Sequence, residues 1–246
     1  MTDLSESAPA KVPTKTKPKK QKFLCGMRKQ LLPLRRVPFE GTVTDERCNK
    51  LIRHCAALAE LDRELPVTIL FNSRGGDIDA MDALIDRFGA LGVRLQGVVI
   101  GQASSAALDI FLRCDRRKRF VLPRASVLPH FSSLKVKLIA RSEEQLLADA
   151  QKFAKDHWRD EERGRRWICE RTGLPPESLP ELLSDGQDLR RALNAERMVA
   201  LGFAAGILED FDFKKPHPKL EPWAFEAKAE TAAEASAFPP ESPPPA

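Results

Sequence analysis

Two junctions in the sequence carry residues that could perform acyl-transfer chemistry. The first, FNSRGGD, contains Gly75 and Gly76, and the second, GQASSAA, contains the adjacent serines Ser104 and Ser105. Glycines let the chain turn sharply with exposed amide N–H groups, and two such groups can bind a developing oxyanion. A serine flanked by small residues can attack a carbonyl once a base takes its proton. Together the junctions indicate a nucleophile beside an oxyanion site.

His130 is the best candidate for the base among the four histidines. It ends the segment RASVLPH, where Pro129 stiffens the backbone. His54 lies within a helical pattern, His157 lies in a charged helical segment, and His217 lies in the C-terminal region. We therefore expect His130 to act on the serine.

Each of these features also has an ordinary structural explanation. A pair of small serines more often caps or packs a helix than attacks a substrate, and a Gly-Gly pair is usually only a turn. A single histidine is more often structural or on the surface. The GQASSAA segment alone does not decide between Ser104 and Ser105.

Alternating apolar periodicities predict the elements that would position these residues. The run 67–72 is typical of a buried strand, 77–91 has one apolar helical stripe, and 93–100 is the next strand. A helix over about 103–114 follows, and then extended segments that include 126–130. This order predicts right-handed βαβ units on a mainly parallel sheet, where ligands bind at the strand-to-helix junctions.

Two further helices flank this region. The segment 37–41 is a candidate strand, and Thr44 is a candidate cap for a helix over 45–61. A long helix is predicted from near Ser142 to about Thr172, where a glycine and two prolines end it.

Composition divides the chain into a basic tail over 1–30, a folded domain over 31–212 and a Pro/Ala/Glu-rich tail over 213–246. We expect both tails to be disordered. The net charge of +5 comes from the first tail, which holds eight Lys and Arg against two Asp and Glu. The domain has no basic excess, which disfavours a nucleic-acid partner.

The five cysteines form no CxxC pair and no metal-ligand spacing. No segment approaches the roughly 20 apolar residues of a membrane helix, and no signal or transit peptide pattern opens the chain. We expect a cytoplasmic protein with no membrane span, metal or cofactor.

Several motifs in order resemble those of the ClpP family, the proteolytic subunits of the Clp protease, over about residues 36–210. The family's INSPGG is similar to FNSRGGD, its GQAAS to GQASS, and its LPxSxVxxH to LPRASVLPH, with Ala125 in place of the serine. An apolar strand before Gly and Val-Thr-Asp is similar to VPFEGTVTDE, and LNAERMVALGFAAGIL resembles a late family motif. The intervals 76 to 105 and 105 to 130 agree with the family without insertion.

The resemblance implies a ClpP/crotonase-like fold: α/β, with repeated βαβ units on a mainly parallel sheet and a long protruding helix. It implies a serine endopeptidase with Ser105, not Ser104, as the nucleophile and His130 as the base. The backbone amides of Gly76 and Ala106 would bind the oxyanion.

The resemblance also implies an acidic third member of the triad. Asp185 comes within one residue of its expected place, and Asp188 is the alternative. The segment HFSS after His130 departs from the family's His-Gln-Pro, and the second half of the predicted helix over 142–173 is dense in charge. In the family these segments help to join two rings.

By the same resemblance, the substrates would be peptides or unfolded proteins, and the chain would form a homo-oligomer such as a heptameric ring. The sequence has no GxxxxGK[ST] motif, so unfolding would require a partner ATPase. The alternatives are a catalytically inactive scaffold or regulatory subunit, a crotonase-like acyl-CoA enzyme, and a nucleic-acid binder acting through the basic tail.

Overall fold

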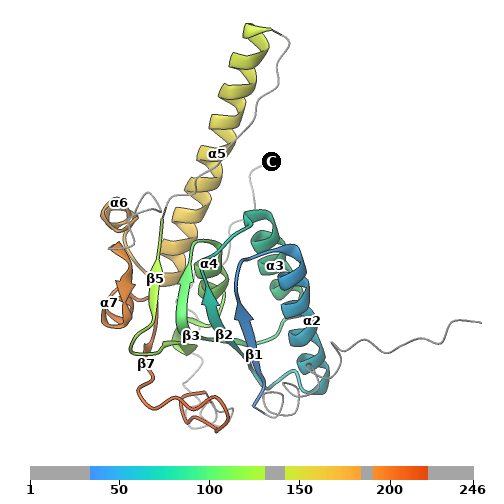
Figure 1. Cartoon of the computed structure of the whole chain (residues 1–246), viewed down its shortest axis with the longest axis vertical. Helices are drawn as coiled ribbons and strands as arrows, with labels where there is room; N and C mark the ends of the chain where they lie inside the picture. Colours follow the sequence, from blue (N-terminus) through green and yellow to red (C-terminus); the bar gives the residue numbers. More distant parts are fainter. Residues whose placement is uncertain (1–33, 131–141, 184–190, 221–246) are drawn as a thin grey trace, which may run out of the picture.

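The computed structural model describes residues 34–130, 142–183 and 191–220 of the 246-residue chain. Within these ranges one seven-stranded sheet forms the centre of the molecule (Figure 1). Five strands lie side by side in the order β1 (Arg36–Glu40), β2 (Val67–Ser73), β3 (Leu95–Ser104), β4 (Arg119–Val121) and β7 (Gly206–Ile207). Two more continue it: β5 (Ser126–Leu128) pairs with β3, and β6 (Leu193–Asn194) pairs with β5. The β5–β6 pair is antiparallel and the other pairs are parallel.

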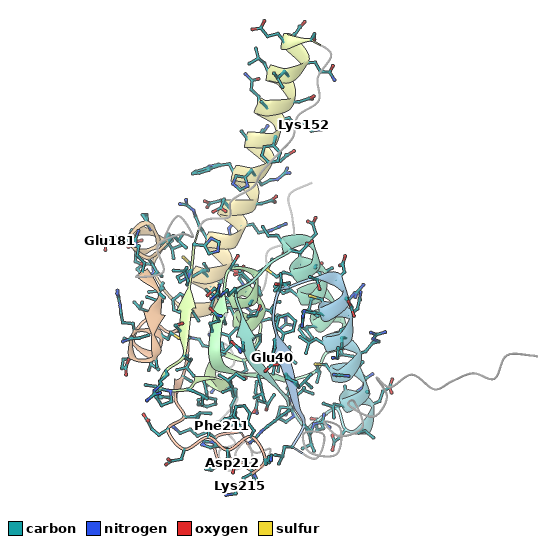
Figure 2. All side chains as sticks on the ribbon, in the orientation of Figure 1. Glu40, Lys152, Glu181, Phe211, Asp212 and Lys215 are labelled. Atoms are coloured by element: carbon teal, nitrogen blue, oxygen red, sulfur yellow. The ribbon has the colours of Figure 1, made fainter. Side chains whose placement is uncertain are left out.

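Helices cover one side of the sheet and extend beyond it. The principal ones are α2 (Asp45–Leu61), α3 (Ile78–Leu91), α4 (Ala106–Leu112) and α5 (Glu143–Thr172). The shorter ones are α6 (Leu179–Leu182), α7 (Ala195–Ala200) and the 3-10 turns Arg116–Lys118 and Pro176–Ser178. The first part of α5 projects far from the body (Figure 1). Its side chains near Lys152 point outward around the helix, away from the sheet (Figure 2).

Local sequence signals define the helix ends. Thr44, Asp77 and Ser142 accept hydrogen bonds from the backbone amide three residues later, at the starts of α2, α3 and α5. The helices α3 and α5 end where Gly92 and Gly173 adopt left-handed backbone angles. The predicted cap at Thr44 and the predicted end of the long helix are confirmed.

Apolar side chains lie on both faces of the sheet, which explains its nearly continuous apolar strands. On the helical face, alternate residues of β2 such as Ile69 and Phe71 join a large core with α2, α3 and α4. On the other face, Leu70 joins a smaller cluster that Leu208 and Leu220 complete. The expected α/β fold with a mainly parallel sheet is confirmed.

The segment after β7 returns to this second face. The Arg36 guanidinium donates to the carbonyl oxygens of Asp212 and Phe213, at 2.8 and 2.9 Å, and lies over the Phe211 ring. Figure 2 places Phe211, Asp212 and Lys215 at the end of the body opposite the projecting α5. The limits 31–212 for the domain stay a prediction, and residues 213–220 lie beyond the predicted end.

The strand β3 is longer than the sequence predicted. Residues 93–100 were expected to form the strand and about 103–114 the next helix, whereas β3 continues to Ser104 and α4 begins at Ala106. The extension occurs because Gln102–Ser104 pair with β5. The pairing of β2 with β3 shifts register between Phe71 and Ser73, where β3 turns toward β5.

Phe111 lies at the centre of the larger core and tests its packing. Its ring contacts Phe71 edge to face at 5.4 Å, and both side chains are fully buried. We expect Phe111→Ala to lower the free energy of unfolding by about 3–5 kcal/mol, because it removes buried area and leaves a cavity. Urea denaturation measures this loss.

Leu61→Ala is the matched control, because Leu61 ends α2 and is 78% exposed. Its effect should stay within about 0.5 kcal/mol. Equal losses in the two variants would contradict the described core.

Candidate active site

Ser105 occupies a strained turn between β3 and α4. Its φ of 54° and ψ of −137° lie in a region that non-glycine residues rarely adopt. The Ser105 amide donates to the Leu128 carbonyl of β5 at 3.3 Å, and its side chain makes no capping hydrogen bond to α4. A serine at a sharp strand-to-helix turn is the arrangement of a nucleophile elbow, which presents the hydroxyl to a ligand.

The backbone of Gly75 lies directly against this turn. A Cβ atom on Gly75 would be 2.6 Å from both the Ser104 carbonyl oxygen and the Ser105 Cβ, and 3.1 Å from the Ala106 amide nitrogen. The residue also has a positive φ of 95°. Only glycine permits this contact between the segment after β2 and the start of α4.

The backbone N–H of Gly76 points away from Val43, the residue that pairs with this segment. Val43 donates to the Gly75 carbonyl and accepts from the Asp77 amide, at 2.9 and 3.1 Å. In such a parallel bridge the middle residue does not bond to its partner, so the N–H of Gly76 faces away from Val43. The amide of Ala106 is the first of α4, and a helix does not use its first amides internally.

His130 follows β5 by two residues. Because Leu128 pairs with Ser104 and accepts from the Ser105 amide, the end of β5 lies beside the serine turn. Ser105, Ala106 and His130 all line one cavity of about 360 Å³. The structure therefore brings residues from two strand ends to the same space, as a serine–histidine pair requires.

The cavity continues between α3 and α5. Its apolar wall includes Ile78, Met81 and Ile85 of α3 and Trp167 and Ile168 of α5. Apolar side chains are the usual lining of a ligand site.

Several carboxylates also line this cavity, and Asp109 is the most perturbed of them. Burial raises the pKa of the Asp109 carboxyl to about 7, and the nearby charges of Asp82 and Glu161 raise it further. Burial also raises the pKa of Asp82, although the Arg163 guanidinium, 2.7 Å away, opposes this. A carboxyl with such a pKa changes its charge near neutral pH.

Cys48 and Cys114 do not compete with Ser105 as nucleophiles. Burial raises the pKa of the Cys48 thiol to about 11 and that of Cys114 to about 12, so both stay protonated and inert at neutral pH. Neither residue lines the cavity.

The sequence identified part of this site. Ser105, Ala106 and His130 meet at the cavity, and Gly75 lies against the serine turn, whereas Gly76 lies against Thr42 and Val43. Ser104 instead ends β3, where it pairs with Leu128. The predicted acids Asp185 and Asp188 lie outside the described residues.

Sequence reasoning missed the acidic part of the cavity. Asp109 follows Ser105 by only four residues, and this short separation along the chain was the available signal. Asp160 and Arg163 come from α5, and no local pattern connects them with Ser105. Across the described ranges, no three His, Cys, Asp or Glu residues are arranged to hold a metal ion. In the same part of the chain, no helix is both long and apolar enough to cross a membrane.

The model of the family described as Clp protease matches residues 19–210, which is most of the sequence. The chain belongs to the Clp protease family. The match includes Gly76, Ser105 and His130, so all three lie within the family's own region. The family assignment agrees with the resemblance of the motifs around these residues.

Curated members of the family are similar over part of their length. The ATP-dependent Clp protease proteolytic subunit 1 of Cutibacterium acnes is 31% identical over 96 residues, which are 39% of this chain and 44% of that protein. Subunit 2 of Mycobacterium tuberculosis is 34% identical over 100 residues, 40% of this chain and 47% of that protein. The chain thus spans about half the length of these relatives.

A solved structure shows the fold of the family over a longer region. A single-residue variant of ClpP1 from Listeria monocytogenes matches with a TM-score of 0.64 and 24% identity. The match covers 77% of this chain and 99% of that chain. The chain therefore has the ClpP/crotonase-like fold.

Gly75→Ala tests the contact between the two junctions. The new Cβ would be forced against the Ser104 carbonyl at an unfavourable φ, so we expect a loss of about 2 kcal/mol or more in the free energy of unfolding. Gly89→Ala is the control, because Gly89 lies inside α3 and its Cβ would meet nothing closer than 3.9 Å. The control should gain up to about 1 kcal/mol. A Gly75→Ala protein as stable as the wild type would contradict the contact.

Asp109→Asn tests the electrostatics of the cavity. The native state keeps a proton on Asp109 up to about pH 7, whereas an unfolded aspartate loses it near pH 4. The wild type therefore loses stability as pH rises through this window, and an uncharged Asn does not. We expect the melting temperature of the variant relative to the wild type to rise from pH 4.5 to pH 7.5. A constant difference over that range would show that Asp109 titrates normally.

Proposed function

We propose that the chain is a serine endopeptidase that hydrolyses peptide bonds through Ser105 and His130. The observation that carries the proposal is the meeting of Ser105 and His130 at one cavity, with Gly75 packed against the serine turn. Membership of the Clp protease family supports the same reaction class.

The reaction is an acyl transfer in two steps. His130 takes the Ser105 hydroxyl proton while Oγ attacks the peptide carbonyl carbon, and the protonated imidazole then gives this proton to the leaving amine. The acyl group is left on Oγ. Water, activated by His130, attacks this ester, releases the new carboxyl end and returns the proton to Ser105.

The backbone amides of Gly76 and Ala106 are the proposed oxyanion donors. Gly76 faces away from Val43, and Ala106 follows the serine as the first residue of α4. Val43 hydrogen bonds hold the backbone on either side of Gly76, and α4 holds Ala106, so the two amide dipoles would need little reorganisation when the oxyanion forms.

We propose Asp185 as the acid that orients the protonated His130, with Asp188 as the alternative. The support is the place of Asp185 in the sequence relative to the family's pattern. Loss of activity in Asp185→Asn, with activity kept in Asp188→Asn, would identify it. The reverse result would assign the role to Asp188.

The proposed substrates are peptides or unfolded proteins, cleaved by a homo-oligomer of the chain in the cytoplasm. The relatives are named as proteolytic subunits of ATP-dependent proteases, which supports a partner ATPase. On α5, Leu147 and Trp158 expose 57% and 62% of their surface, as a helix that contacts another subunit does. Native mass measurement determines the number of subunits.

A fluorophosphonate probe tests the nucleophile, because it reacts only with an activated serine. We expect the probe to label the wild-type protein and Ser104→Ala, and Ser105→Ala to lose the label completely. Ser104→Ala is a close control, since it removes the neighbouring hydroxyl and leaves the turn in place. A folded, assembled wild type that takes no label would overturn the peptidase and favour an inactive scaffold or regulatory subunit.

A further inference from the structure

The cavity beside Ser105 extends over charged groups that take no part in acyl transfer. Five carboxylates line it, against two guanidinium groups. The carboxylates are Asp82, Asp86, Asp109, Asp160 and Glu161, and the guanidinium groups are Arg163 and Arg165. The cavity therefore carries an excess of negative charge next to the proposed nucleophile.

Asp109 is the carboxylate nearest to Ser105 along the chain. It lies one helical turn later in α4, and its backbone amide donates a hydrogen bond to the Ser105 carbonyl oxygen at 3.4 Å. Ser105 precedes the helix and Asp109 lies within it, and both residues line the same cavity. A group extending from a carbonyl bound at Ser105 thus reaches Asp109 along one wall.

The Asp109 carboxylate has no hydrogen-bond or ion-pair partner in the described part of the chain. The groups that act on it electrostatically, Asp82 and Glu161, carry the same sign of charge. Asp109 is half-buried, and a carboxylate that is partly removed from water without a counter-ion is costly, so a bound cation lowers that cost.

The two guanidinium groups are engaged elsewhere. Arg163 pairs with Asp82 at 2.7 Å and with Asp160 at 3.6 Å, and Arg165 lies over the Trp158 ring. Asp109 is therefore the member of the cluster that most needs a positive partner.

Apolar side chains of two helices line the same cavity as the carboxylates. They are Ile78, Met81 and Ile85 of α3 and Trp167 and Ile168 of α5. Lysine and arginine have apolar stems and charged ends, so their side chains fit an apolar passage with a carboxylate at its base.

We propose that this cavity binds a Lys or Arg side chain of the substrate, on the acyl side of the cleaved bond, and that Asp109 determines this specificity. The inference rests on the proposed peptidase function and names its substrate class. A carboxylate at the base of a specificity pocket selects cationic side chains, because neutral ones leave it buried and unpaired.

The preference should depend on pH. Since Asp109 ionises near neutral pH, the ratio of Lys to Leu cleavage should rise from pH 6 to pH 8. The charged groups facing Asp109 are Asp82 and Asp86 of α3, Asp160, Glu161, Arg163 and Arg165 of α5, and His130. Taking the ratio of two substrates at each pH cancels any pH dependence that both reactions share.

Two measurements on the full-length assembled protein test the inference. The first compares kcat/KM for fluorogenic peptides that differ only in Lys, Arg or Leu before the scissile bond. The second measures binding of p-aminobenzamidine, a fluorescent aromatic cation, to Ser105→Ala, which needs no catalysis. Each is repeated with Asp109→Asn and with Asp79→Asn, an exposed aspartate of α3 outside the cavity.

We expect the wild type to favour Lys and Arg over Leu by about tenfold or more, and Asp109→Asn to lose that preference. Cleavage after Leu should persist in Asp109→Asn, which shows that the variant folds, and Asp79→Asn should behave as the wild type. Benzamidine binding should weaken about tenfold in Asp109→Asn alone. Preference for Leu in the wild type, or an unchanged ratio in Asp109→Asn, overturns the inference.

The outcomes separate this inference from the peptidase proposal. If the protein reacts with the fluorophosphonate probe, cleaves after Leu and binds no benzamidine, the peptidase proposal stands and the cationic pocket is overturned. If benzamidine binds in a way that depends on Asp109 but the probe does not label the protein, the cationic pocket stands and the peptidase proposal is overturned.

Discussion

The contact between Gly75 and the turn at Ser105 is the constraint on which the site depends. A side chain of any size at Gly75 would meet the Ser104 carbonyl and the Ser105 Cβ at 2.6 Å. The parallel pairing of β2 and β3 brings both strand ends to one edge of the sheet, and the register shift after Phe71 lets β3 run on to β5. His130 then follows from the pairing of β5 with β3. One sheet edge thus holds the amide segment, the serine and the histidine.

The same topology explains why the cavity has two chemically distinct ends. The end at Ser105 consists of backbone turns and a histidine, which suits a carbonyl that becomes an oxyanion. The part between α3 and α5 is lined by apolar side chains and carboxylates. The helix α4 contributes to both parts, since Ala106 begins it and Asp109 lies one turn later. This short helix links the site of chemistry to the site of selectivity.

The sequence predicted those parts of the structure that depend on nearby residues. The strands around residues 67–72 and 93–100, the cap at Thr44 and the end of α5 at Thr172 all have local signals, and all were confirmed. The extension of β3 to Ser104 was not predicted, because pairing with a strand more than twenty residues later determines it. Small residues at 103–106 are equally compatible with a helix until that pairing is known.

In the candidate site, too, only the residues with local sequence signals could be predicted. Ser105 and His130 could be named because sequence motifs flank both, whereas the acidic wall depends on how α5 crosses α4 and α3. Nothing in the charged run around Asp160 and Arg163 indicates which of its side chains face a cavity.

The decisive measurement is a crystal structure of the protein after reaction with a peptidyl diphenyl phosphonate. Phosphorus should be bonded to Ser105 Oγ, with its oxygen about 2.7–3.1 Å from the amide nitrogens of Gly76 and Ala106. Phosphorus on another residue, or an oxygen that neither amide contacts, would contradict the proposed site.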